Sequence, residues 1–137
     1  MTDKLKFFSP EWCNAAIAAI NANPEFSAGL KDPSTFTNKM EFGVIDREGL
    51  VSHVESVEGR VESWTPRTFD EGELWMIINA SLKTWQTAAE GREGGEKLLM
   101  TGQIKLAKGP VAAVVENSEA LNVFLRTWGE IPTDWDV

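Results

Sequence analysis

The spacing of apolar residues changes twice along this chain, from a helical period to an alternating one and back, and this limits the fold more than any other feature. The first segment with helical spacing begins at Pro10, next to a capping serine and an acid that suits the positive helix end, and stops near Asn23. From Phe36 to Val44 apolar and polar residues largely alternate, which is typical of a strand with one buried face. After Ser81 the helical spacing returns. The chain therefore combines helices with a sheet.

Turn residues divide the chain into further short elements. The predicted strands cover residues 36–44, 50–57, 61–64, 74–78 and 103–107. The run at 74–78 is apolar at every position, so we expect both of its faces to be buried. The later helices are predicted after Ser81, at 96–100 and beyond Pro110, with a break at Asn117-Ser118. This order predicts an α+β fold with one mostly antiparallel sheet and helices on one face.

The length of 137 residues suits one domain with one hydrophobic core. We expect residues 1–137 to form this single domain. Residues 129–137 are expected to be a tail, in which Trp135 is the odd apolar member.

The charge balance limits the partners of this chain. Its net charge of −8 disfavours nucleic acid, because phosphate binding depends on Lys and Arg. The same charge opposes anionic bilayers, so we expect at most transient membrane contact. No stretch is long and apolar enough for a transmembrane segment, and the first residues lack the apolar part of a signal peptide, so the expected location is the cytoplasm.

Residues with catalytic potential are few and scattered. His53 is the only histidine and shares a predicted strand face with Glu55, but the cysteines that complete a zinc deaminase signature are missing. We expect an exposed or half-exposed strand histidine there, and a buried, unreactive Cys13. Segment 91–97 reads as a turn and not as a phosphate-binding loop. The sequence thus predicts no catalytic residue, no metal and no cofactor. An enzyme that uses His53 with a nearby carboxylate is the least favoured alternative.

Apolar side chains make up 42% of the chain and include six Trp and four Met. Such residues either interdigitate in an ordinary core or leave an apolar cavity between them. Composition leaves both alternatives open.

A pattern in the second half of the chain favours the cavity over the ordinary core. Its parts are segment 75–81 (Trp-Met-Ile-Ile-Asn-Ala-Ser), Trp85, Glu90-Gly91 and segment 98–109, which ends in Gly-Gln-Ile-Lys-Leu-Ala-Lys-Gly. This pattern resembles the sterol carrier protein 2 (SCP2) family of small lipid-carrier domains, although Gln103 stands where the family usually has Lys and Pro110 where an acid is common. The resemblance implies a five-stranded sheet with helices on one face and a hydrophobic tunnel between the layers. It also implies binding of sterols, fatty acids, fatty acyl-CoA, phospholipids or isoprenoid quinones, without catalysis.

The resemblance also implies which residues contact the ligand. The matched positions are Ile77, Trp85, Leu99, Met100, Ile104 and Leu106. Phe124 and Trp128 are added because they belong to the apolar stripe of the last helix.

The sequence therefore predicts a non-catalytic carrier that holds a sterol, fatty acyl or isoprenoid-type ligand in an apolar cavity. Such a cavity has to match the bilayer and not exceed it, because burying a 16-carbon chain gains roughly 12 kcal/mol in either place. We expect the ligand to enter when the last helix moves about Asn117-Ser118. The alternative is an interaction module with the same fold and a filled core. It would bind a protein partner or a second copy of the chain through exposed Trp12, Trp64 and Trp135.

Overall fold

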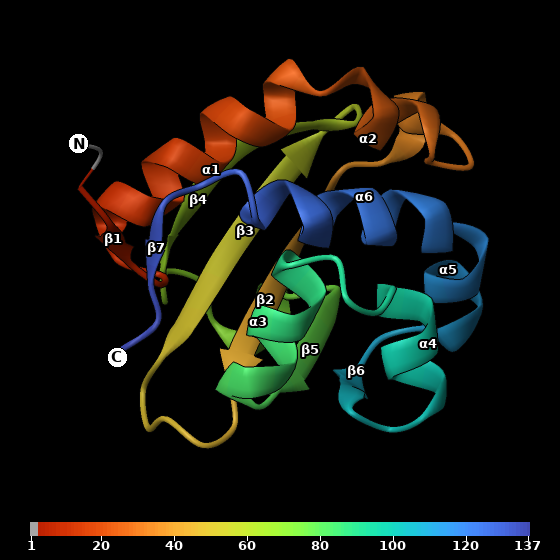
Figure 1. Ribbon diagram of the computed structural model, residues 1–137. Helices are drawn as coiled ribbons and strands as arrows, with labels where there is room; N and C mark the ends of the chain where they lie inside the picture. The colour runs from red at the N-terminus through yellow and green to blue at the C-terminus, as the bar shows by residue number, and fades with distance from the viewer. Residues whose placement is uncertain (1–2) are drawn as a thin grey trace.

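The structure is a computed structural model, and it describes residues 3–137. One layer is a five-stranded sheet in the order β4-β3-β2-β5-β6 (Figure 1). The strands are β2 (Asn38–Val44), β3 (Val51–Val57), β4 (Arg60–Pro66), β5 (Met76–Ala80) and β6 (Ile104–Lys108). Neighbouring strands are antiparallel except for the parallel pair β2 and β5. The predicted α+β class with a mostly antiparallel sheet is confirmed.

The second layer consists of helices that cover one face of the sheet (Figure 1). They are α1 (Pro10–Ala22), α2 (Pro24–Ala28), α3 (Leu82–Ala89), α4 (Gly95–Met100), α5 (Val111–Glu116) and α6 (Ser118–Trp128). Two short 3₁₀ turns, η1 (Pro33–Thr35) and η2 (Glu71–Glu73), precede β2 and β5. They explain why these strands begin two residues later than the alternating pattern predicts.

Local signals in the sequence set several of these boundaries. The side chain of Ser9 accepts a hydrogen bond from the backbone N–H of Trp12, and Ser81 does the same for Thr84. Asn117 leaves the helical region with φ −110° and ψ 21°, so the predicted break separates α5 from α6. The helix starts and the break are therefore encoded by single residues.

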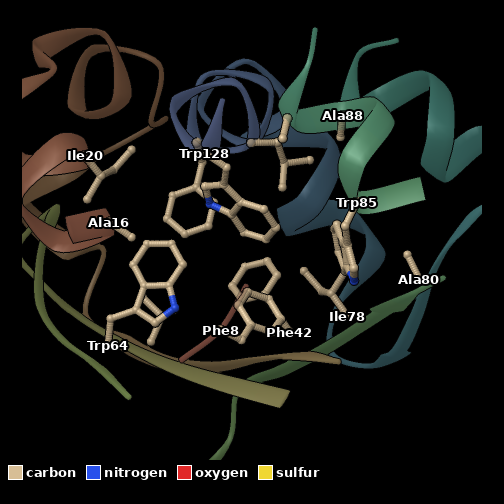
Figure 2. Packing of buried hydrophobic residues seen from close by; sticks show 14 of the residues in the cluster. Phe8, Ala16, Ile20, Phe42, Trp64, Ile78, Ala80, Trp85, Ala88 and Trp128 are labelled. Atoms are coloured by element: carbon tan, nitrogen blue, oxygen red, sulfur yellow. The ribbon is translucent and has the colours of Figure 1, made fainter. Parts of the chain in front are cut away.

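Tightly packed aromatic rings fill one end of the space between sheet and helices (Figure 2). We call Phe7, Phe8, Trp12, Trp64, Trp85 and Trp128 the aromatic cluster; each is at most 2% exposed. The Trp12 ring meets those of Trp64 and Trp128 edge to face, with centroids 5.6 and 5.5 Å apart. Trp12 and Trp64 are thus buried, which is contrary to the exposed positions that the interaction-module alternative assigned to them.

The last residues of the chain pack against this cluster. Strand β7 (Thr133–Asp134) pairs in parallel with β1 (Leu5–Lys6), and the Thr133 hydroxyl accepts a 3.0 Å hydrogen bond from the Trp12 indole. The Trp135 ring lies 4.5 Å from that of Phe7, centroid to centroid. Where the sequence predicted a tail at 129–137, the structure has a segment that covers one end of the core, because Trp135 gains contacts there.

Candidate ligand-binding site

A cavity of about 50 Å³ lies at the opposite end of the space between the layers. We call it the chamber. Its floor comes from β2, β3 and β5, and its cover from α2, α5 and α6. The lining residues are Phe26, Leu30, Phe36, Met40, Phe42, Val54, Ser56, Trp75, Met76, Ile78, Ala113, Val114, Asn117, Ala120, Leu121 and Phe124.

The register of the sheet brings the floor residues together. Parallel pairing of β2 with β5 sets Met40 beside Met76 and Phe42 beside Ile78. Successive strand residues point to opposite faces, so these four side chains share the face that the helices cover. Two flexible Met side chains in one floor give a surface that adapts its shape to what it contacts.

The chamber walls are almost entirely apolar. Only Ser56 and Asn117 bring polar side chains to its lining. Phe36 and Trp75 stand edge to face with centroids 5.9 Å apart, and both are partly exposed, so they form the rim. An apolar chain fits such walls, because the polar groups are few and stand at separate points.

Helix α5 covers the chamber with little packing of its own. Val114 is the one buried residue of this helix, whereas Val111 and Val115 are 62% and 58% exposed. Its C-terminal end is held by the side chain of Asn117, which donates to the Ala113 carbonyl (2.8 Å) and accepts from the Lys31 backbone N–H (2.9 Å). An element with so few buried contacts opens at a low free energy.

The arrangement of layers matches known structures, whereas scans against protein-family models and a search of curated proteins find no match. The chain superposes on a crystal structure of sterol carrier protein 2 with a TM-score of 0.78 and 21% identity, over 92% of this chain and 99% of that one. The chain has the SCP2 fold. A solution structure from Thermus thermophilus, described as possibly a sterol carrier protein, gives a TM-score of 0.76 at 20% identity and covers 97% of this chain and 94% of that one.

A third structure with the SCP2 fold is described as a UbiJ-SCP2 ubiquinone synthesis protein. It gives a TM-score of 0.59 at 9% identity and covers 88% of this chain and 96% of that one. At these identities the matches establish the SCP2 fold, and the ligand has to be argued from the residues of this chain.

Among the predicted contact residues, Phe124 lines the chamber of this SCP2 fold. Ile77 points to the other face of the sheet, opposite the chamber, because it alternates with Met76 and Ile78. Trp85 and Trp128 lie in the aromatic cluster, where the Trp85 indole donates a 2.9 Å hydrogen bond to the Gly43 carbonyl.

The remaining predicted contact residues lie around α4 and β6. Ile104 of β6 is buried in the core, Leu99 of α4 is partly buried, and Met100 is 80% exposed. Leu106 pairs with Ile78 in the sheet and so lies next to a chamber residue. Ligand contact by these residues stays a prediction. The chamber residues that the sequence analysis did not select, Met40 and Met76 among them, come from strands whose shared face becomes visible only in the sheet register.

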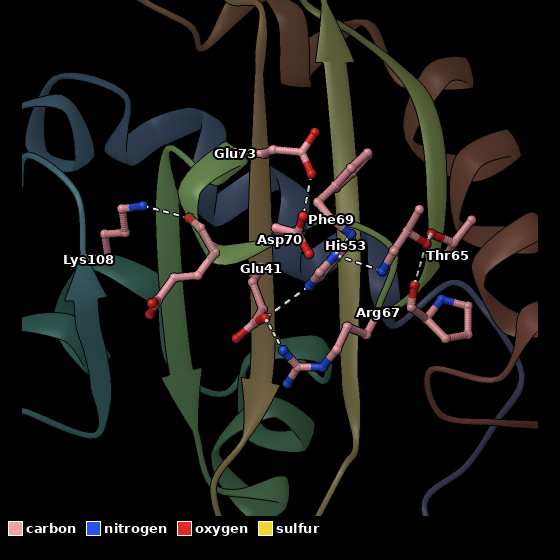
Figure 3. Close-up of polar contacts among 11 residues, drawn as sticks. Glu41, His53, Thr65, Arg67, Phe69, Asp70, Glu73 and Lys108 are labelled. Carbon is pink, nitrogen blue, oxygen red and sulfur yellow. Dashed lines mark hydrogen bonds and ion pairs between the residues drawn. The ribbon is translucent and has the colours of Figure 1, made fainter.

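The sheet face away from the helices carries a buried polar cluster (Figure 3). Nδ1 of His53 accepts hydrogen bonds from the backbone N–H groups of Thr68 and Phe69, both at 2.9 Å. The ring proton is therefore on Nε2, which donates to Glu41 Oε1 at 2.9 Å. Arg67 Nη1 lies 3.5 Å from the same carboxylate oxygen.

This cluster fastens the crossover from β4 to β5 onto the sheet. The Phe69 ring stacks on the His53 ring at 5.6 Å and 3°, and His53 is fully buried. The expected exposed or half-exposed histidine is thus wrong, because the crossover covers that face. Both ring nitrogens of His53 already have partners within the fold, so the arrangement holds the crossover in place and leaves neither nitrogen free.

The thiol of Cys13 is also enclosed. Burial raises the pKa of the Cys13 thiol to about 12, so it stays protonated at neutral pH. Residues 3–137 contain no cluster of three or more His, Cys, Asp or Glu that could hold a metal ion. Within the same described range, no helix is both long and apolar enough to cross a bilayer.

Proposed function

We propose that this chain is a non-catalytic carrier that binds the hydrocarbon part of a lipid in the chamber. The observation that supports this most strongly is an apolar cavity between sheet and helices, placed under a helix with a single buried residue. The SCP2 fold of the solved structures supports the same assignment.

The size of the chamber requires that it widen when a ligand binds. Sites for small molecules usually enclose about 300–1,000 Å³, whereas the chamber encloses about 50 Å³. We infer that α5 moves outward and that Asn117 is the hinge. Helix α6 is the fixed side, because Ala120, Val123 and Phe124 anchor it in the core. This differs from the sequence-based expectation that the last helix itself moves.

The energetics of a chamber of this kind suit transport. Each buried CH₂ gains about 0.8 kcal/mol, and the bilayer offers nearly the same amount. Opening α5 costs part of the gain, so affinity stays close to that of the membrane and the ligand can leave. The adaptable Met floor favours a range of chain shapes over one exact ligand.

A second candidate is a binding subunit with a closed core. The small volume of the chamber and the filled aromatic cluster favour it. Such a subunit would take up no lipid, which separates the two candidates.

Native mass spectrometry of protein purified without detergent tests the proposal. We expect one lipid per chain, identified after organic extraction, or one-to-one uptake of a 12-carbon alcohol, amine or carboxylate by the lipid-free protein. A clean apo mass, together with no uptake of any of the three, would contradict the carrier role and favour the binding subunit.

A further inference from the structure

The chamber continues into a surface groove. The groove encloses about 670 Å³ and shares four lining residues with the chamber, namely Phe36, Trp75, Ala113 and Asn117. Its other lining residues are Lys31, Asp32, Thr35, Thr37, Asn38, Gly72, Glu73, Leu74 and Glu116. An amphiphile with its chain in the chamber would therefore have its head group in this groove.

A polar pair lies where the groove meets the chamber. Asn38 of β2 stands opposite Ser56 of β3 in the sheet register. Ser56 is 2% exposed and lines the chamber, whereas Asn38 lines the groove. Within the described part of the chain, Oδ1 of Asn38 is buried and has no hydrogen-bond partner. A buried acceptor without a partner is costly, so a ligand that brings an N–H or O–H donor to it recovers that cost.

The charges around the groove disfavour an anion. The one lysine among its lining residues, Lys31, is paired with Glu116 at 3.0 Å. The lining carboxylate of Glu73 is paired with Lys39 at 3.6 Å. Asp32 adds a negative charge of its own, since the hydrogen bond from the Ser34 side chain holds the pKa of its carboxyl below the usual value. A carboxylate or phosphate head group would thus meet no free cation among these lining residues.

We propose that chamber and groove form one site for an amphiphile whose head group donates a hydrogen bond to Asn38 and carries no negative charge. Long-chain alcohols, sterol-like alcohols and long-chain amines fit this description, whereas fatty acids and phosphate-bearing lipids do not. The inference rests on the proposed lipid binding and adds the class of head group.

A matched ligand series tests this class. 1-Dodecanol, dodecylamine and dodecanoate share one chain length and differ in the head group, so calorimetric titration at pH 7.5 isolates the head-group effect. We expect the alcohol and the amine to bind about tenfold more tightly than dodecanoate, the size of effect that one good hydrogen bond plus a charge difference gives.

Variants of Asn38 test whether this residue causes the preference for the alcohol and the amine. Asn38→Ala should weaken binding of the alcohol and the amine about fivefold and leave dodecanoate nearly unchanged. Asn38→Asp keeps the acceptor and should favour the amine further. The matched control is Ser52→Ala, which removes another buried oxygen that has no partner among the described residues, away from the chamber lining. It should leave all three affinities unchanged.

The possible results distinguish the head-group inference from the proposed lipid binding. If dodecanoate binds as tightly as the alcohol, or Asn38→Ala weakens all three ligands equally, the head-group inference is wrong while lipid binding stands. If none of the three binds to the folded protein, lipid binding fails and the inference fails with it.

Discussion

The two ends of the space between sheet and helices are both apolar but differ in packing. At one end the aromatic cluster lies under α1 and the C-terminal part of α6, helices of 13 and 11 residues, and is closed by β1 and β7. At the other end the chamber lies under the N-terminal part of α6 and under α2 and α5, which have only 5 and 6 residues. Both the lining and the cover differ. Aromatic rings under long helices and paired chain ends fill one end, whereas Met and aliphatic side chains under two short helices leave volume at the other.

Phe124 connects the two ends. Its ring stacks on Trp64, in the aromatic cluster, at 5.1 Å and 7°, and it also lines the chamber. The cluster thus contributes one packed wall to the chamber, and this contrast with α5 agrees with the proposed opening at α5.

The largest expected effect comes from breaking the filled end. Trp128→Ala removes a ring that is 1% exposed, and we expect it to lower the free energy of unfolding by about 3–5 kcal/mol. Leu121→Ala at the open end should lose only about 1–2 kcal/mol, because Leu121 is half-buried and borders a space that already exists. Urea unfolding measures both. Equal losses would show that the two ends are packed alike.

Filling the open end should block binding at a moderate cost in stability. Ala113→Phe overpacks a chamber of about 50 Å³, so we expect about a tenfold or larger loss of 1-dodecanol affinity together with a loss of about 1–3 kcal/mol in unfolding free energy. Ala112→Phe is the matched control, since Ala112 is an exposed residue of the same helix outside the chamber. Unchanged affinity in Ala113→Phe would place the ligand elsewhere.

Loosening α5 should make the chamber end open more easily and leave the aromatic cluster unchanged. Asn117→Ala removes the two side-chain hydrogen bonds that hold the α5–α6 joint, at a cost of about 1 kcal/mol of stability. We expect lipid transfer between vesicles and protein to become a few times faster, measured by stopped-flow fluorescence. A slower transfer rate would mean that the joint does not limit opening.

At the filled end, burial of Cys13 should make the free energy of unfolding depend on pH, which is a smaller effect. The folded pKa of Cys13 is raised to about 12 by burial, whereas an exposed thiol titrates at about 8.5. The unfolded chain therefore loses this proton first, and stability contributed by the neutral thiol falls as the pH rises from about 9 to 12. Denaturation curves over this range should fall more steeply for the wild type than for Cys13→Ala. Identical slopes would indicate that water reaches Cys13 in the folded chain.

The sequence predicts the layers of this fold better than its cavity. A capping serine, an alternating strand and a polar break are local features, and the structure has a helix start at Pro10, a strand at Asn38–Val44 and a break at Asn117. The side chains of β5 that face the helices could not be predicted in this way. Every residue of the predicted strand is apolar, so the sequence does not distinguish one face from the other. Only the parallel pairing of β5 with β2 decides this, and that pairing depends on a crossover fastened by His53.

The candidate site was therefore only partly predictable. Phe124 could be chosen from the helical stripe because one face of α6 is strongly apolar, whereas Met40 and Met76 share a face only through the long-range register. The burial of Trp12 and Trp64 likewise depends on contacts between distant segments.

If this protein is a lipid carrier, a lipid chain should enter the chamber and leave the rest of the core unchanged. NMR of the methionine methyl groups tests it most directly, since Met40 and Met76 line the chamber whereas Met100 is 80% exposed and lies outside it. On titration with 1-dodecanol, the signals of Met40 and Met76 should shift together and saturate at one ligand per chain, while that of Met100 stays in place. A shift of Met100 alone, or saturation with no change at Met40 and Met76, would contradict the claim.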